Sequence, residues 1–384
     1  MRWLQGSMRQ SGIFVALVVI VAFFAILNKN FLSPGNLTNI VLQYSYILIL
    51  AIGMLMVIVL GQIDLSVGSL VAFTGAVAGV LVIQSGMPWW LGALTAILVG
   101  VAAGAWHGLW VAYVGIPGFI VTLAGMLLFR GLTYQVLHNV SLSPFPGEYY
   151  TIANGFLNGL LGGPGYDVFT LVIFGVCVAA YAWTTFRTRA RRIGYGQEVS
   201  SVPVTIGKLV VVGAVVMWFA FQLSVSRGLP IILILLALLV LVYGIVTKKT
   251  PFGRDIYAIG GNKEAARLSG INVKRVTFLT FVNMGFLCGI AGVAFSARMN
   301  SAQPGAGNMF ELDAIAACFI GGASTTGGTG RVAGALIGGL IMSVLSNGMQ
   351  LMGADTSTQQ IVKGLVLLLA VAFDVFNRRR AGLQ

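Results

Sequence analysis

The chain has 384 residues, of which 58% are hydrophobic and only 9% are charged, and its mean hydropathy is +0.93. Soluble globular proteins carry about 25% charged residues, so this composition excludes that class and predicts an all-α polytopic membrane protein, with residues 1–384 as a single domain. The formal net charge of +13 does not indicate nucleic-acid binding, because the basic residues gather in a few loops without interleaved aromatic residues.

The first apolar run, Ile13–Leu27, follows Arg2 and Arg9. It ends at Asn28 without the small-residue pattern of a cleaved signal peptide, so we interpret it as a retained first span. Further apolar runs follow at about 38–60, 65–84, 90–113, 118–137, 168–186, 205–224, 229–247, 276–296, 312–324, 331–350 and 359–376.

Backbone polar groups in lipid must be satisfied within the segment, so each full span is predicted to be a helix. Pieces that glycines interrupt are tolerated only where they face protein or a cavity. The twelve runs therefore predict about 10–12 transmembrane helices, some of them broken by Gly-rich segments.

A polar break separates the second run from the third. Asp64 precedes Ser66 and Gly68 at the point where a helix is expected to restart. The carboxylate could cap free amides of that helix, or it could face a substrate path, and the sequence leaves both roles open.

The distribution of Lys and Arg predicts the orientation. Basic residues gather at both termini, in the 187–192 loop and in the loop at about 248–275, whereas the connection at about 138–167 has none. Since cytoplasmic loops carry the excess of Lys and Arg, both termini and the 248–275 loop are predicted to be cytoplasmic. The 138–167 loop is then external, either as a docking surface or as a disordered connection.

The most densely charged segment lies between the eighth and ninth apolar runs and is predicted to hold a docking helix. Asn262 can cap it through the side-chain oxygen, Glu264 suits the positive end of the helix dipole, and Gly270 can adopt the left-handed conformation that ends it.

So short a helix is marginal in water, and we therefore expect a partner protein to pack on it. Ala265 and Ala266 would give the docking face small side chains that leave no room for bulk. The alternative is a solvated loop.

No catalytic or cofactor site can be assembled from the sequence. Cys177, Cys288 and Cys318 all lie inside apolar runs, and His107 and His138 are isolated, so neither metal binding nor covalent catalysis is indicated and no cofactor is expected.

The Gly-rich segment 321–331 lacks the Gly-Lys-Ser/Thr ending of a phosphate loop. It could pack helices closely through small residues, or it could break a helix beside a substrate path. At an offset of 260 positions, Gly61 and Gly68 fall on Gly321 and Gly328, which fits either chance or a structural repeat in which both breaks line one path.

Several motifs are similar to those of a known family. Glu264-Ala-Ala, three residues and then Gly270 resemble the signature of membrane subunits of bacterial ABC importers. Five further segments resemble the pattern of the ribose/xylose/galactose-type sugar permeases. They are Ile63-Asp-Leu-Ser-Val-Gly68, Pro117-Gly-Phe-Ile-Val-Thr-Leu-Ala-Gly-Met126, Tyr257-Ala-Ile-Gly-Gly-Asn262, Glu311-Leu-Asp-Ala-Ile-Ala-Ala317 and Ile320-Gly-Gly-Ala-Ser324. The match spans about residue 38 to the end and is nearest to the xylose and multiple-monosaccharide permeases, which carry an extra apolar pair where residues 168–224 lie.

The resemblance implies a permease homodimer in the bacterial inner membrane, surrounded by lipid. It also implies two cytoplasmic ATP-binding subunits that hydrolyse ATP in place of this chain, and an external sugar-binding protein. The candidate coupling residues are then Asn262, Glu264, Ala265, Ala266 and Gly270. The candidates for a sugar path are Gln43, Asp64, Ser66, Asn283, Asp313 and Ser324, because neutral polar groups and carboxylates bind sugar hydroxyls.

Two rival functions remain open. An ion-coupled secondary sugar carrier would need ionisable groups inside the membrane, for which Asp64 and Arg130 are the main candidates. A membrane enzyme or scaffold is disfavoured because no catalytic constellation is present.

Overall fold

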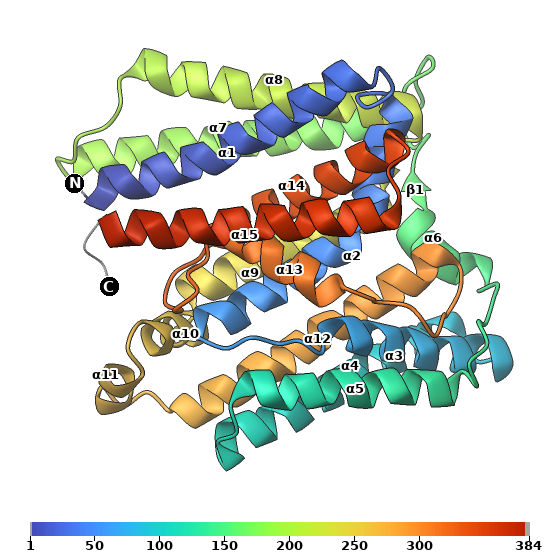
Figure 1. Ribbon diagram of the computed structural model, residues 1–384. Helices are drawn as coiled ribbons and strands as arrows, with labels where there is room; N and C mark the ends of the chain where they lie inside the picture. Colours follow the sequence, from blue (N-terminus) through green and yellow to red (C-terminus); the bar gives the residue numbers. More distant parts are fainter. Residues whose placement is uncertain (1, 381–384) are drawn as a thin grey trace.

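Most of the protein is helical in the computed structural model, which describes residues 2–380 (Figure 1). In chain order the helices are α1 (Arg2–Leu27), α2 (Pro34–Val59), α3 (Val67–Gly79), η1 (Val80–Gln84), α4 (Trp89–Leu109), η2 (Trp110–Val114), α5 (Gly118–Val136), α6 (Gly147–Asn154), α7 (Val168–Gly194), α8 (Val202–Ser226), α9 (Ile231–Lys249), α10 (Pro251–Gly261), α11 (Lys263–Leu268), α12 (Val273–Met299), α13 (Phe310–Ile320), α14 (Val332–Leu351) and α15 (Thr356–Arg380). η1 and η2 are π-helical turns that continue α3 and α4. The strands β1 (Phe156–Leu157) and β2 (Leu229–Pro230) form a short antiparallel pair.

The starts of many helices follow from their capping residues. Ser33, Asp167, Thr250, Asn262 and Asn272 each accept a hydrogen bond from a backbone N–H in the first turn of the helix that follows. Such side-chain acceptors satisfy amides that have no partner within the helix, so these polar residues determine where the helices begin.

The predicted fold class is confirmed. Within residues 2–380, nine helices are long and apolar enough to cross a bilayer, and the shorter apolar stretches Gly12–Leu27 and Thr356–Ala372 belong to α1 and α15. α13 has only 11 residues and is about 17 Å long, roughly half of the hydrocarbon core. It is therefore one of the broken segments that the glycine pattern predicted.

The helices run side by side, and their two ends carry different features (Figure 1). The start of α1, the end of α15, α10 and α11 lie at one end, on the left, which we call the α11 end. α6 and β1 lie at the opposite end, which we call the α6 end. This separation agrees with the predicted topology, in which the termini and the 248–275 loop share a side.

α2 forms the centre of the bundle. In its most apolar stretch of 18 residues, 89% of the residues are buried, and the helix contacts α8, α9, α12, α13 and α14. By contrast, only 6% and 11% of the residues are buried in the corresponding stretches of α7 and α8, and these helices pack on each other. A helix that is apolar all round and exposed in this setting faces lipid, so α7 and α8 form a peripheral pair.

Two non-helical stretches lead back into the bundle before short helices begin (Figure 1). One joins α2 to α3, and the other joins α12 to α13. They meet where a Cβ on Gly68 would lie 2.2 Å from the carbonyl oxygen of Gly307, a distance that only a glycine permits. The starts of α3 and α13 are thereby held against each other inside the bundle.

The 138–167 connection is ordered, so a disordered connection is excluded. Its helix α6 places Tyr149 in the core, where the phenol is fully buried, stacks on Phe145 with ring centroids 4.1 Å apart, and forms a 2.8 Å hydrogen bond with the Ser296 hydroxyl. Pairing of β1 with β2 fastens the rest of the connection to the start of α9.

Candidate functional site

The α11 end carries the predicted docking helix with the expected boundaries. Asn262 Oδ1 accepts a 2.9 Å hydrogen bond from the Ala265 amide, and Gly270 has a φ of +86°. Glu264 lies in the first turn and also forms a 2.9 Å ion pair with Arg267, in which both side chains are about two-thirds exposed. Cap and stop are therefore confirmed, whereas the docking role stays a prediction.

A second helix, α10, precedes α11 and was not predicted. Thr250 Oγ1 accepts a 3.1 Å hydrogen bond from the Gly253 amide, and Pro251 occupies the first helical position. A Thr-Pro pair is a recognisable helix start, so the signal was present in the sequence. Ile256 and Ile259 are buried, which fastens α10 to the bundle.

The prediction that both alanines form the docking face needs correction. Ala266 is only 4% exposed and belongs to the same apolar cluster as Ile256 and Ile259, so it packs α11 on its own chain. Ala265 is exposed, and Leu268 is 83% exposed at the end of the helix. On a helix, neighbouring positions point about 100° apart, which separates the two alanines.

α10 also connects α11 to two segments that are distant in the sequence. A Cβ on Gly260 would lie 1.7 Å from the Val59 carbonyl oxygen, so α10 crosses the end of α2 in direct backbone contact. The same oxygen accepts a 2.8 Å hydrogen bond from the Gly328 amide, and the Tyr257 hydroxyl donates a 2.7 Å hydrogen bond to the Gly330 carbonyl. We call this meeting of α2, α10 and the 321–331 loop the backbone crossing.

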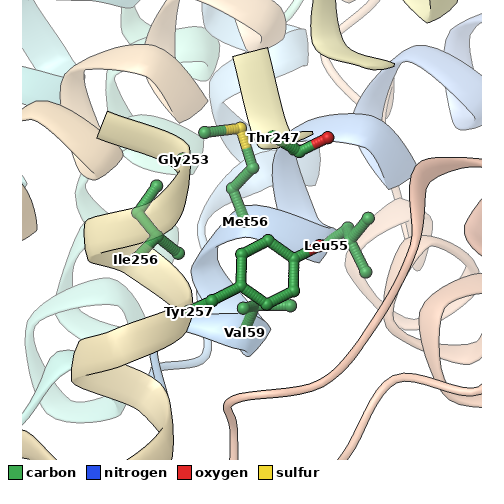
Figure 2. A pocket seen from close by; sticks show the side chains of 7 residues that line it. All are labelled: Leu55, Met56, Val59, Thr247, Gly253, Ile256 and Tyr257. Carbon is green, nitrogen blue, oxygen red and sulfur yellow. The ribbon is translucent and has the colours of Figure 1, made fainter. Parts of the chain in front are cut away.

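Side chains close the space beside the backbone crossing. Figure 2 shows the ring of Tyr257 packed among side chains of α2 and α10, in a crevice with no room for a water molecule. Its lining residues are Leu55, Met56, Val59, Thr247, Gly253, Ile256 and Tyr257. A small displacement of α10 must therefore also displace α2, because close-packed groups cannot move independently.

The 321–331 segment is a loop between α13 and α14, and close backbone packing accounts for its glycines. Ser324, a path candidate, is 1% exposed here and forms a 2.8 Å hydrogen bond with the Thr326 hydroxyl, so it shapes the loop at the α11 end. The breaks at 61–66 and 321–331 lie directly against each other and not on opposite walls of a path, as a repeat would require, since a Cβ on Gly327 would lie 3.1 Å from Gly61.

Asp64 does not cap α3, because no side chain within residues 2–380 accepts a hydrogen bond from an amide in the first turn of this helix; its carboxylate instead bonds to Ser66, the residue just before the helix. The Asp64 side chain is 2% exposed, and its Oδ1 accepts hydrogen bonds from the Ser66 amide at 2.8 Å and the Ser66 hydroxyl at 2.6 Å. Ser66 is itself fully buried. Both candidates therefore form one local turn directly before α3.

The start of α13 holds the remaining acidic candidate in an ion pair. Both oxygens of Asp313 accept 3.0 Å hydrogen bonds from Lys363 Nζ on α15, and the side chains are 15% and 23% exposed respectively. Nearby, Arg130 donates hydrogen bonds to the Pro304 and Ala306 carbonyls and so fixes the stretch that leads into α13. Lys363 was not predicted, although a lone lysine in an apolar run is a signal of function.

Aromatic rings lie one turn before Asp313. Phe310 stacks on Tyr46 of α2 with ring centroids 4.8 Å apart, and Phe295 of α12 packs edge-on against both rings. Flat rings beside polar groups suit the apolar faces and hydroxyl edges of a sugar. We call Tyr46, Phe295, Phe310, Asp313 and Lys363 the α13 cluster.

The last two path candidates lie elsewhere. Gln43 donates a 3.1 Å hydrogen bond to Gln350 and belongs to a polar row on α2, formed with Asn36 and Asn39. Asn283 accepts a hydrogen bond from the Tyr243 hydroxyl and contacts Met56 Sδ at 3.6 Å, so it joins α12 to α9 and α2. The six candidates thus do not form one cluster.

Residues 36–371 match the family described as the permease component of branched-chain amino acid transport systems. The chain is 40% identical to the xylose transport system permease protein of Haemophilus influenzae, over 95% of this chain and 96% of that protein. It is also 40% identical to the Escherichia coli K12 xylose permease, over 95% and 91%, and 35% identical to the Bacillus subtilis ribose import permease, over 96% and 94%. No solved structure matches the chain.

Proposed function

The chain belongs to the family of transport permeases that includes the xylose and ribose permeases, and we propose that it is the membrane-spanning subunit of an ATP-driven monosaccharide importer. The substrate is xylose or a related pentose or hexose. One observation carries this proposal: 40% identity to xylose permeases extends over 95% of the chain.

The proposed assembly contains two copies of this chain, two ATP-binding subunits and a separate sugar-binding protein. The names of the xylose permeases, which describe them as parts of transport systems, support the presence of further subunits. The α11 end faces the cytoplasm, as seven basic residues against two acidic ones in 248–275 favour. The α6 end then receives the sugar-binding protein.

Coupling starts at the exposed face of α11, which carries Ala265 and Leu268 and seats in the ATP-binding subunit. Leu268, which is 83% exposed, lies one turn after Ala265 and adds apolar area to this face of the helix. Movement of α11 passes through α10 to the backbone crossing, and from there to the end of α2 and the loop before α14. The backbone crossing therefore gates the cytoplasmic end of the path.

The sugar passes beside the α13 cluster. The stacked rings of Tyr46 and Phe310 form an aromatic wall, and the Asp313–Lys363 pair offers a charged acceptor and donor for hydroxyls. Broken helices place such groups at membrane depth in many transporters, which supports a path where α3 and α13 begin.

Reconstitution in liposomes tests the function. Co-expressed with its ATP-binding subunits and sugar-binding protein, the chain is expected to import xylose with xylose-stimulated ATP hydrolysis. Purified alone, it is expected neither to bind nor to hydrolyse ATP, because it has no phosphate loop. Xylose uptake by the isolated chain, driven by an ion gradient, would overturn the proposal in favour of a secondary carrier.

A further inference from the structure

A hollow of about 360 Å³ lies between α4, α10 and α12, and none of its lining residues belongs to the α13 cluster. Its walls come from three helices: α4, α10 and the second to fourth turns of α12. The lining residues are Val101, Phe252, Leu279, Val282, Asn283 and Phe286. Since α4 and α12 are both spans, the hollow opens at membrane depth.

The wall of the hollow suits a hydrocarbon chain. Five of its six residues are apolar, and the sixth, Asn283, turns its oxygen to Tyr243 and its amide nitrogen to Met56. A sugar would find few free hydrogen-bonding groups here, whereas an acyl chain needs none.

Cations lie at the water-facing side of the hollow. Arg275 precedes Leu279 by one turn and shares its face of α12, because residues four apart in a helix lie above one another. Lys248, Lys249 and Lys274 are exposed at the same end. Within residues 2–380, none of these four basic side chains has an ion-pair partner.

Aromatic residues mark the depth of the lipid headgroups. Trp110 and Tyr113, in η2 at the end of α4, are 39% and 50% exposed. Tyr113 packs on Phe278 of α12, with ring centroids 5.8 Å apart. Trp and Tyr gather where membranes meet water, so the first turns of α12 lie at the headgroup level.

We propose that this hollow binds an anionic phospholipid of the leaflet at the α11 end. An acyl chain fills the hollow, and Arg275 binds the phosphate with the help of the neighbouring lysines, as basic pockets between membrane helices do. A second copy of the chain is a poor occupant, because two strongly basic faces would repel each other.

Native mass spectrometry of the full-length protein tests this site. The detergent-purified chain is titrated with phosphatidylglycerol and with phosphatidylcholine carrying the same acyl chains. We expect phosphatidylglycerol to be retained more tightly, and Arg275→Gln to weaken its retention about fivefold, as one lost cation predicts. Leu279→Trp fills the hollow and is expected to reduce retention of both lipids.

Matched controls make the result specific. Lys208→Gln removes one exposed cation from the start of α8, and Val210→Trp places the same indole ring at an exposed, lipid-facing position there. Both are expected to retain phosphatidylglycerol like the unmodified chain. Equal losses in Arg275→Gln and Lys208→Gln, or no preference for phosphatidylglycerol, would overturn the site. So would efficient cross-linking between copies through Leu279→Cys, which would place a second copy there.

Discussion

The Asp313 carboxylate and the Lys363 ammonium form the most consequential single contact of the α13 cluster. Asp313→Asn leaves a lysine in a largely buried site without its counter-charge, and we expect a loss of about 3 kcal/mol in unfolding free energy. Replacing both residues, by Asp313→Leu with Lys363→Met, is expected to restore most of the stability. A double-mutant cycle on thermal unfolding in detergent measures this coupling.

Transport separates a structural role from a sugar-binding role for the same pair. If the pair only fastens α13 to α15, the stable double variant imports xylose normally. If Asp313 binds sugar hydroxyls, as proposed, the double variant folds but its uptake falls severalfold. Normal uptake by that variant would remove the α13 cluster from the path.

Asp167 predicts a pH dependence at the α6 end. Burial alone would raise the pKa of Asp167, but hydrogen bonds from the Thr170 hydroxyl and from the amides of Thr170 and Gly159 outweigh it and lower the pKa below its ordinary value. A lowered folded-state pKa stabilises the protein above the unfolded pKa, and this stabilisation is lost as the pH falls through the folded value.

We therefore expect Asp167→Ala to cost about 1 kcal/mol near neutral pH, as removal of a helix cap does. The difference from the unmodified chain should shrink in acid, below the pKa of Asp167. Thermal unfolding across pH measures it. Glu148→Gln, an exposed change in the same connection, serves as the control, and a difference that persists unchanged in strong acid would contradict the assignment.

The helix α11 can pass movement of the ATP-binding subunit to α10 only if it ends at a fixed place. Gly270 has a φ of +86°, and a β-branched residue there is strained by about 1–3 kcal/mol. We expect Gly270→Val to insert normally but to lose co-purification with the ATP-binding subunits and most uptake. Unchanged uptake would show that this stretch is only a connecting loop.

The two alanines of α11 are expected to respond differently to bulk. Ala265→Trp adds its ring to the exposed face, so it should block binding of the ATP-binding subunit while leaving thermal stability unchanged. Ala266→Trp overpacks a buried site and should lower stability by about 1–3 kcal/mol. Equal losses of stability in both tryptophan variants would contradict this assignment of faces.

Glu264→Ala should lower the free energy of unfolding by less than about 1 kcal/mol, since the ion pair of Glu264 with Arg267 is exposed.

Features that depend on neighbouring residues could be predicted from the sequence, whereas features that depend on residues far along the chain could not. Asn262 and Gly270 set their own boundaries within a few residues, so the cap and stop of α11 were predictable. The partner of Asp313 lies 50 positions away on α15, and no local pattern encodes that distance. The face of Ala266 likewise depends on α10, a helix that the sequence interpretation missed.

The membrane topology of the protein can be tested by labelling. Ser143 and Ser269 are exposed; Ser143 lies four residues before α6, and Ser269 directly follows α11. In a background without Cys177, Cys288 and Cys318, Ser143→Cys is expected to react with an impermeant maleimide in intact cells, and Ser269→Cys only after permeabilisation. Labelling of both from one side would overturn the orientation.

The polar row on α2 has a consequence for how the protein is made. Asn36, Asn39 and Gln43 hydrogen-bond to Asn347, Arg298 and Gln350, all from the last quarter of the chain. During synthesis, α2 leaves the ribosome long before these partners are made. Until then its carboxamides lack these hydrogen bonds, and α2 remains at the insertion machinery or in lipid, where unsatisfied polar groups are costly. Ribosome-bound chains that stop before α12 should therefore keep α2 accessible to protease or to cross-linking with the insertion machinery, and chains that extend past α14 should protect it. Equal protection in both would mean that α2 finds other partners first.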